Sequence, residues 1–251
     1  LRLPRKHIPC ASEEKIHLMF RKTFIFNSLV ISKAIAKTVS FSTLYGLTIT
    51  LSSDHFGTFT ICLFLGNLIA SFFNASKLSY LISLKNITKQ VCFTLQIVEF
   101  FKFTIMISLL IISAKWIIKF YNLEISNLVF ISLCSSSLFS LLHTVEINRK
   151  QIEGKFFWQN FVTLSSPLIV IVCLSYNYFT HVVQLEHVAL AYLIGAIITC
   201  IIPSLILGYP KGTFIRRDFK RFIIYHFKIT YSSLTNVSVN QSTGFILSLH
   251  L

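Results

Sequence analysis

The sequence predicts an all-α integral membrane protein with six membrane-spanning helices and the start of a seventh. Three observations lead to this prediction. The chain is 54% hydrophobic, with 25 Phe and only 13% charged residues, whereas roughly a quarter of the residues in a soluble domain are charged. Its mean hydropathy is +0.70. Its apolar residues form continuous runs of about 20 or more, the length of a bilayer-crossing helix, without the alternation typical of a transmembrane barrel.

The apolar runs divide the chain into elements. Six runs are long enough to cross a bilayer and a seventh begins near the end of the sequence; they cover residues 24–52, 57–76, 91–118, 125–146, 156–180, 187–208 and 229–251. The first 18 residues are polar and contain two prolines, and Met19 opens a short basic segment that is typical of a natural start. We therefore expect a polar extension over 1–18, a six-helix lobe over 19–208, a linker over 209–228 and the truncated seventh helix over 229–251.

The distribution of Lys and Arg predicts an orientation in the membrane. The chain carries 23 Lys and Arg against nine Asp and Glu. Eighteen of them lie in the N-terminal segment and in every second connection between apolar runs, and the other connections hold two. Because cytoplasmic loops are enriched in Lys and Arg, we expect a cytoplasmic N-terminus and a cytoplasmic 209–228 linker. Cations placed between apolar runs also argue against nucleic-acid binding.

The 209–228 linker contains an amphipathic segment. Between residues 211 and 227, large apolar side chains recur at helical spacing and cationic side chains stand between them. A helix of this kind lies in the membrane interface, with its cations on anionic headgroups and its aromatic rings below them. A specific lipid-phosphate docking site is the alternative to a plain cytoplasmic anchor. The residues expected to contact headgroups are Arg216, Arg217, Lys220 and Arg221.

Four ionisable residues fall well inside the expected spans, away from their ends, where each costs about 2.5–3.5 kcal/mol to insert. Lys33 and Lys37 lie four apart in the first span, and Glu99 and Lys102 lie three apart in the third, so each pair shares a helix face. Glu99 and Lys102 either neutralise each other or handle substrate or protons. The first span has no acid, so its lysines either reach the cytoplasmic interface or face an anion. Lys37 lies deeper and is the better candidate for the anion.

The sequence shows no motif for catalysis or for binding of a metal or cofactor. Its six cysteines have no paired spacing, so neither a disulfide framework nor a zinc site is predicted. Nucleotide-binding, hydrolase and metalloprotease motifs are absent. His143 and Glu146, three apart at a helix end, are interpreted as a surface pair rather than as metal ligands. We therefore expect neither an enzyme nor a cofactor.

Residues 27–84 join a long first helix to the second through a short turn. Their sequence is NSLVISKAIAKTVSFSTLYGLTITLSSDHFGTFTICLFLGNLIASFFNASKLSYLISL. It resembles the opening of polysaccharide (O-antigen type) flippases in the multidrug/oligosaccharidyl-lipid/polysaccharide exporter superfamily. In that family the turn has the form L-G-x-x-x-F-G-x-F, and residues 51–59 (LSSDHFGTF) stand in its place, with Ser52 where the family has glycine. The helix spacing and the basic turn at 148–155 extend the resemblance to roughly 20–251.

The resemblance implies a six-helix transporter lobe that is the N-terminal half of a flippase. Such a flippase moves a lipid-linked oligosaccharide, for example an O-antigen or capsule repeat unit, across the inner (cytoplasmic) membrane by alternating access. It implies a substrate linked to undecaprenyl pyrophosphate, and Glu99 is then the candidate for ion or proton coupling. Candidate residues for substrate binding are the cations Lys33, Lys37 and Lys102 and the amides Asn67 and Asn74. Each amide has interhelical hydrogen bonding as its alternative role.

Two other functions are kept as alternatives. A multidrug exporter of the same superfamily, driven by sodium or protons, needs buried acids, and Glu99 fits that description. A truncated membrane protein without transport activity is the third possibility. Because alternating access requires two lobes, we expect a missing C-terminal half or a second copy of the chain as a partner.

Overall fold

The structure, a computed structural model, describes residues 11–74, 77–84, 86–180 and 183–229. Within these ranges the chain is helical, without strands, so the prediction of an all-α protein is confirmed. The elements are α1 (Ala11–Thr50), α2 (Ser53–Asn74), α3 (Lys77–Ser83), α4 (Lys89–Phe120), α5 (Asn127–Leu138), the 3₁₀ helix η1 (Phe139–Leu142), α6 (Val145–Ile152), α7 (Phe157–Thr180), α8 (Leu185–Leu207) and a helix over 216–229.

Three helices of the described ranges, α4, α7 and α8, are long and apolar enough to cross a membrane, which indicates a membrane protein. A fourth span arises if α5 with η1 is joined to α6 across a bend of 52°. These four match the expected third, fifth, sixth and fourth spans. Helices α1 and α2 cover the expected first two spans but are not among these candidates, so the count of six spans stays a prediction. The expected seventh span lies outside the described residues apart from its first position, Ile229.

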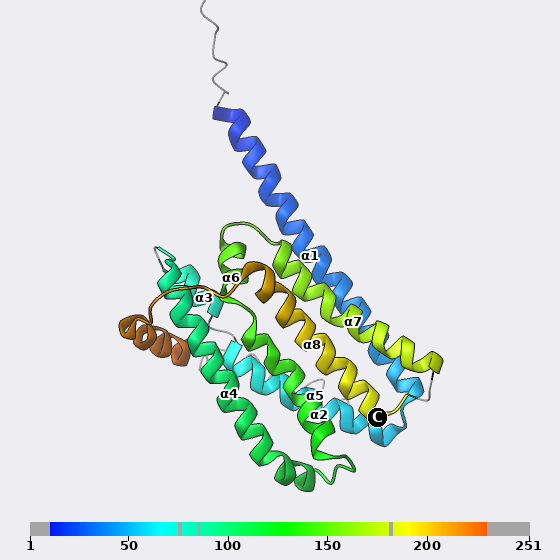
Figure 1. Ribbon diagram of the computed structural model, residues 1–251. Coiled ribbons are helices and arrows are strands. Elements are labelled where there is room, and N and C mark those ends of the chain that lie inside the picture. Colours follow the sequence, from blue (N-terminus) through cyan, green and yellow to red (C-terminus); the bar gives the residue numbers. More distant parts are fainter. Residues whose placement is uncertain (1–10, 75–76, 85, 181–182, 230–251) are drawn as a thin grey trace, which may run out of the picture.

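Helix α5 is the central element of the bundle. It packs against α2, α4 and α8, and α7 lies between α8 and α1 (Figure 1). The largest apolar cluster fills these contacts, with Phe59 from α2, Phe130 and Leu133 from α5 and Val188 from α8 all fully buried. Helix α1 contacts chiefly α7, and its N-terminal part extends beyond the rest of the bundle (Figure 1).

Small residues allow two helix pairs to approach closely. A Cβ added to Gly66 of α2 would lie 2.6 Å from the carbonyl oxygen of Cys134 in α5. The Cys134 thiol in turn donates a hydrogen bond to the carbonyl oxygen of Cys62, at 3.3 Å. On the other side of the bundle, Gly195 of α8 faces Val170 of α7. Close backbone approach at small residues is the usual way in which membrane helices associate.

The connections that are rich in Lys and Arg lie together at one end of the bundle. Helices α3, α6 and 216–229 gather around the N-terminal half of α4, whereas the α1–α2, α4–α5 and α7–α8 connections lie at the opposite end (Figure 1). We call the first of these the basic end. A second apolar cluster holds it together and comprises Tyr80, Leu81, Val91, Cys92, Leu95, Val98, Val145 and Phe222.

Candidate functional site

Glu99 of α4 forms a buried ion cluster with two lysines. Its Oε1 lies 3.0 Å from Lys102 Nζ and its Oε2 lies 3.8 Å from Lys77 Nζ. All three residues are buried, Glu99 completely so. The sequence predicts the pair Glu99 and Lys102 from their spacing, but it gave no signal for Lys77, which comes from α3 and which the charge pattern places in a cytoplasmic connection. One carboxylate therefore faces two ammonium groups.

Backbone carbonyl oxygens accept hydrogen bonds from both ammonium groups and so partly offset the second positive charge, which the single carboxylate does not balance. Lys77 donates hydrogen bonds to the carbonyl oxygens of Leu141, at 3.2 Å, and His143, at 3.4 Å, where η1 ends before α6. Lys102 donates to the carbonyl oxygen of Phe73 in the last turn of α2, at 3.3 Å. Carbonyl groups at helix C-termini lack intrahelical partners and carry partial negative charge. The ion cluster thus ties α2, α3, α4 and the break before α6 together.

Helix 216–229 covers the ion cluster with aromatic rings. Lys102 Nζ lies 4.7 Å from the ring centroid of the fully buried Phe222, in a cation–π contact. The ring of Tyr80 meets Phe222 edge-on at 5.1 Å, and the ring of Phe73 stacks on His226 at 6.0 Å. The linker that the sequence predicts as an interfacial helix therefore also packs through one face against α3 and α4.

Acidification is expected to destabilise the contacts of helix 216–229 through His226. Burial, together with the neighbouring Lys102 cation, lowers the pKa of His226 from its ordinary value of 6.5 to about 4. Because the folded pKa lies below the unfolded one, this group contributes stability above pH 6.5 that is lost as the pH falls toward 4, at up to about 1.4 kcal/mol per pH unit. The midpoint of thermal unfolding in detergent, measured at pH 7.5 and pH 5, reports this loss.

The variant His226→Phe separates this effect from other titrating groups. It keeps an aromatic ring against Phe73 and Phe222 but takes up no proton. The drop in unfolding midpoint between pH 7.5 and pH 5 should therefore shrink in the variant. If the drop is as large in His226→Phe as in the wild type, His226 is not its source.

The outer face of helix 216–229 carries the predicted headgroup contacts. The four cations Arg216, Arg217, Lys220 and Arg221 are all exposed. The large apolar residues Ile224 and Phe227, in the following turns of the helix, are also exposed, with 49% and 69% of their surface accessible. Exposed cations and exposed apolar side chains on one helix match an anionic membrane surface. The helix therefore has one face against the bundle and one suited to headgroups.

Lys33 and Lys37 lie on a face of α1 that is exposed in the part of the chain that the structure describes. Both are exposed, and neither forms an ion pair within the part of the chain that the structure describes. Helical geometry places them about a quarter of a turn around α1 from the buried residues Thr43 and Leu47. Ser32, on the buried side, donates to Asn160 Oδ1 of α7 at 2.9 Å. The structure therefore does not bring these lysines to the ion cluster, and they form a separate cationic surface, the lysine face.

The remaining predicted residues have other surroundings. Asn67 Oδ1 accepts a hydrogen bond of 2.8 Å from the hydroxyl of Ser137, which joins α2 to α5 and agrees with the interhelical interpretation. The side chain of Asn74 lies outside the described residues. Glu146 pairs with Arg149 at 2.6 Å. Over the described ranges, no group of three or more His, Cys, Asp and Glu side chains is arranged to hold a metal ion.

Comparison with known proteins adds no family to this description. No family model, no curated protein and no solved structure matches the chain. The likeness of residues 27–84 to polysaccharide flippases therefore stays a prediction from the sequence.

Proposed function

We propose that this chain is one lobe of a transporter that moves an anionic, lipid-linked oligosaccharide across the cytoplasmic membrane by alternating access, with its N-terminus in the cytoplasm. The observation that carries the proposal is the lysine face of α1. Two cations stand on one side of a helix that the sequence predicts to cross the bilayer, and no acid neutralises them among the described residues. Each costs about 2.5–3.5 kcal/mol to insert. The pyrophosphate of a lipid-linked sugar is an anion that offsets this cost.

The lysine face also suggests where a second lobe packs. Helix α1 contacts chiefly α7, and large apolar side chains beside the two lysines, Phe41 and Tyr45, are 71% and 64% exposed. Alternating access needs a second bundle that moves against the first around a central site. We place that partner, a C-terminal half or a second copy of the chain, against this face of α1.

The multidrug exporter is the less supported alternative. Export of cationic drugs, or coupling to sodium, requires an acid that is free to bind a cation. Glu99 is held between Lys77 and Lys102, at 3.8 Å and 3.0 Å, so a cation or proton has to compete with both ammonium groups. Glu99 remains our candidate for coupling only if one of these lysines leaves it during transport.

The proposal predicts that the double variant Lys33→Ala/Lys37→Ala binds undecaprenyl pyrophosphate at least about tenfold more weakly than the wild type, a loss of about 1.4 kcal/mol. Binding is measured by titration of the purified chain in detergent, because binding to one lobe needs no transport. Lys115→Ala/Lys119→Ala is the matched control, since these two lysines are also four apart and exposed, on α4. The control is expected to bind as the wild type does.

Three results would overturn the proposal. Unchanged affinity in Lys33→Ala/Lys37→Ala would remove the lysine face from the substrate site. Tight binding of the cation tetraphenylphosphonium would favour the multidrug exporter if Glu99→Gln abolishes it. A control variant that is destabilised to the same folded fraction should then keep this binding. Failure of the wild type to bind either compound would favour a membrane protein without transport activity.

A further inference from the structure

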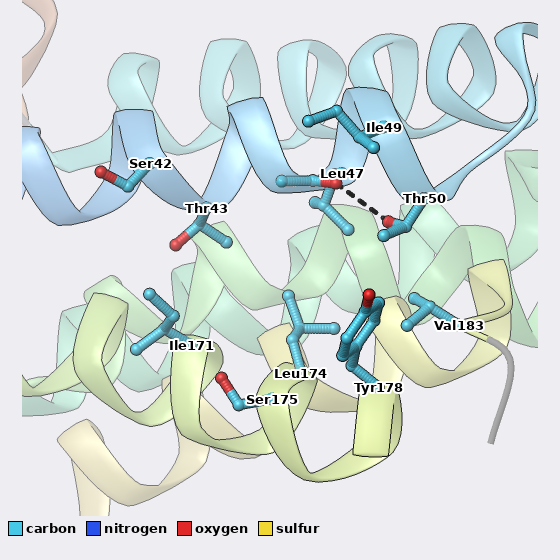
Figure 2. A pocket seen from close by; sticks show the side chains of 11 residues that line it. Ser42, Thr43, Leu47, Ile49, Thr50, Ile171, Leu174, Ser175, Tyr178 and Val183 are labelled. Carbon is cyan, nitrogen blue, oxygen red and sulfur yellow. Dashed lines mark hydrogen bonds between the residues drawn. The ribbon is translucent and has the colours of Figure 1, made fainter. Parts of the chain in front are cut away.

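A cavity of about 400 Å³ lies between the C-terminal halves of α1 and α7 (Figure 2). The α1 wall includes Thr43, Leu47 and Thr50, and the α7 wall includes Ile171, Leu174 and Tyr178. The exposed residues Ile49, Ser175 and Tyr178 also line it, so it opens at the surface of the bundle. It lies away from the basic end, and its lining includes no residue of the ion cluster.

The cavity wall carries no charge, which favours an uncharged occupant. No lining residue carries a formal charge. Three hydroxyl groups of α1 line the cavity, and each donates its hydrogen bond to a backbone carbonyl oxygen four residues earlier in the same helix. The donors are Ser42, Thr43 and Thr50, and the distances are 3.0, 2.8 and 3.0 Å. These side chains therefore offer carbon surface and acceptor lone pairs, and a hydrocarbon leaves none of these three hydroxyl donors unsatisfied.

The size and surroundings of the cavity fit one hydrocarbon chain. Its volume is near the lower end of the range of small-molecule pockets, about 300–1,000 Å³. It extends along α1 from Ser42 to Thr50, which is about 12 Å of helix. One of its two walls, α7, is long and apolar enough to cross a membrane, so phospholipid chains are the hydrocarbon present at high concentration beside its opening.

We propose that this cavity binds an acyl chain of a membrane phospholipid and holds it between α1 and α7. Within the described ranges α1 packs chiefly on α7 and touches α2 at few positions. The bound acyl chain therefore fills space at the main contact of α1. Binding here is independent of the transport proposed above, because it involves neither the lysine face nor an anionic group.

Gly46 offers a direct way to fill the cavity. It lines the cavity, and a Cβ added to it meets no atom within 4 Å. Gly46→Leu should therefore occupy the space without moving the helices. Gly57→Leu, on α2, is the matched control, since a Cβ there also meets nothing and the residue does not line the cavity. Ser175→Leu fills the cavity from α7 and provides a second variant should Gly46→Leu fold poorly.

The test uses nanodiscs that contain the purified protein and phosphatidylglycerol with a photoreactive diazirine on its acyl chain. After illumination, we expect lipid adducts to concentrate on residues 42–50 and 171–178, above the level on the exposed residues Ile201 and Leu205 of α8. Gly46→Leu and Ser175→Leu should lose this excess, and Gly57→Leu should keep it. An even spread of adducts over exposed residues, or an excess that survives both filling variants, would overturn the inference without affecting the binding of undecaprenyl pyrophosphate.

Discussion

Glu99→Gln is expected to lower the free energy of unfolding by about 3–5 kcal/mol, the cost of removing one partner from a buried ion pair. The carboxylate is fully buried and is the anion that Lys77 and Lys102 share. Its removal leaves two ammonium groups in the interior with carbonyl oxygens as their partners. The unfolding midpoint in a denaturing detergent such as SDS, measured against wild type, gives the loss.

Two comparison variants make this prediction specific. Glu153→Gln removes an exposed carboxylate that pairs with Arg149, Lys150 and Lys155, and surface pairs of this kind contribute about 0–1 kcal/mol. Replacement of all three cluster residues by Met removes every charge together and is expected to be far less harmful than Glu99→Gln. If Glu99→Gln unfolds at the same detergent concentration as Glu153→Gln, the cluster does not stabilise the basic end.

Gly66→Ala is expected to be the second most harmful change, at about 1–3 kcal/mol. The new Cβ would lie 2.6 Å from the carbonyl oxygen and 2.9 Å from the Cα of Cys134. Both are backbone atoms of α5, so no side chain can rotate away and α2 has to separate from α5. The same detergent titration measures the loss.

Gly57→Ala is the control for Gly66→Ala. It lies in the same helix, and its added Cβ meets no atom within 4 Å. Because Ala favours a helix over Gly by up to about 1 kcal/mol, Gly57→Ala should be neutral or stabilising. Equal effects of the two substitutions would contradict the close contact between α2 and α5.

The positions of the long helices were predictable from the sequence because apolar run length is a direct signal. The expected runs at 91–118, 156–180 and 187–208 correspond to α4, α7 and α8 within a few residues. The break before α6 was not predicted, since the apolar run continues to residue 146. A local signal existed at Thr144, whose hydroxyl accepts a hydrogen bond from the Glu146 amide at the start of α6.

Less of the candidate site was predictable. The contact between Glu99 and Lys102 follows from their spacing on one helix. Lys77 joins them only through tertiary folding, which brings α3 against the break before α6, and no periodicity in the sequence reports this. The side of α1 that packs on α7 was equally hidden, because apolar residues surround Lys33 and Lys37 on every face of that helix.

The proposed function is tested most directly by the ratio of two dissociation constants of the wild-type chain, for undecaprenyl pyrophosphate and for the uncharged undecaprenol in the same detergent. The two lipids share their hydrocarbon chain, so the ratio isolates recognition of the anion. If the lysine face binds the pyrophosphate, the charged lipid should bind at least about tenfold more tightly. Equal dissociation constants would contradict a role for this face in binding an anionic, lipid-linked substrate.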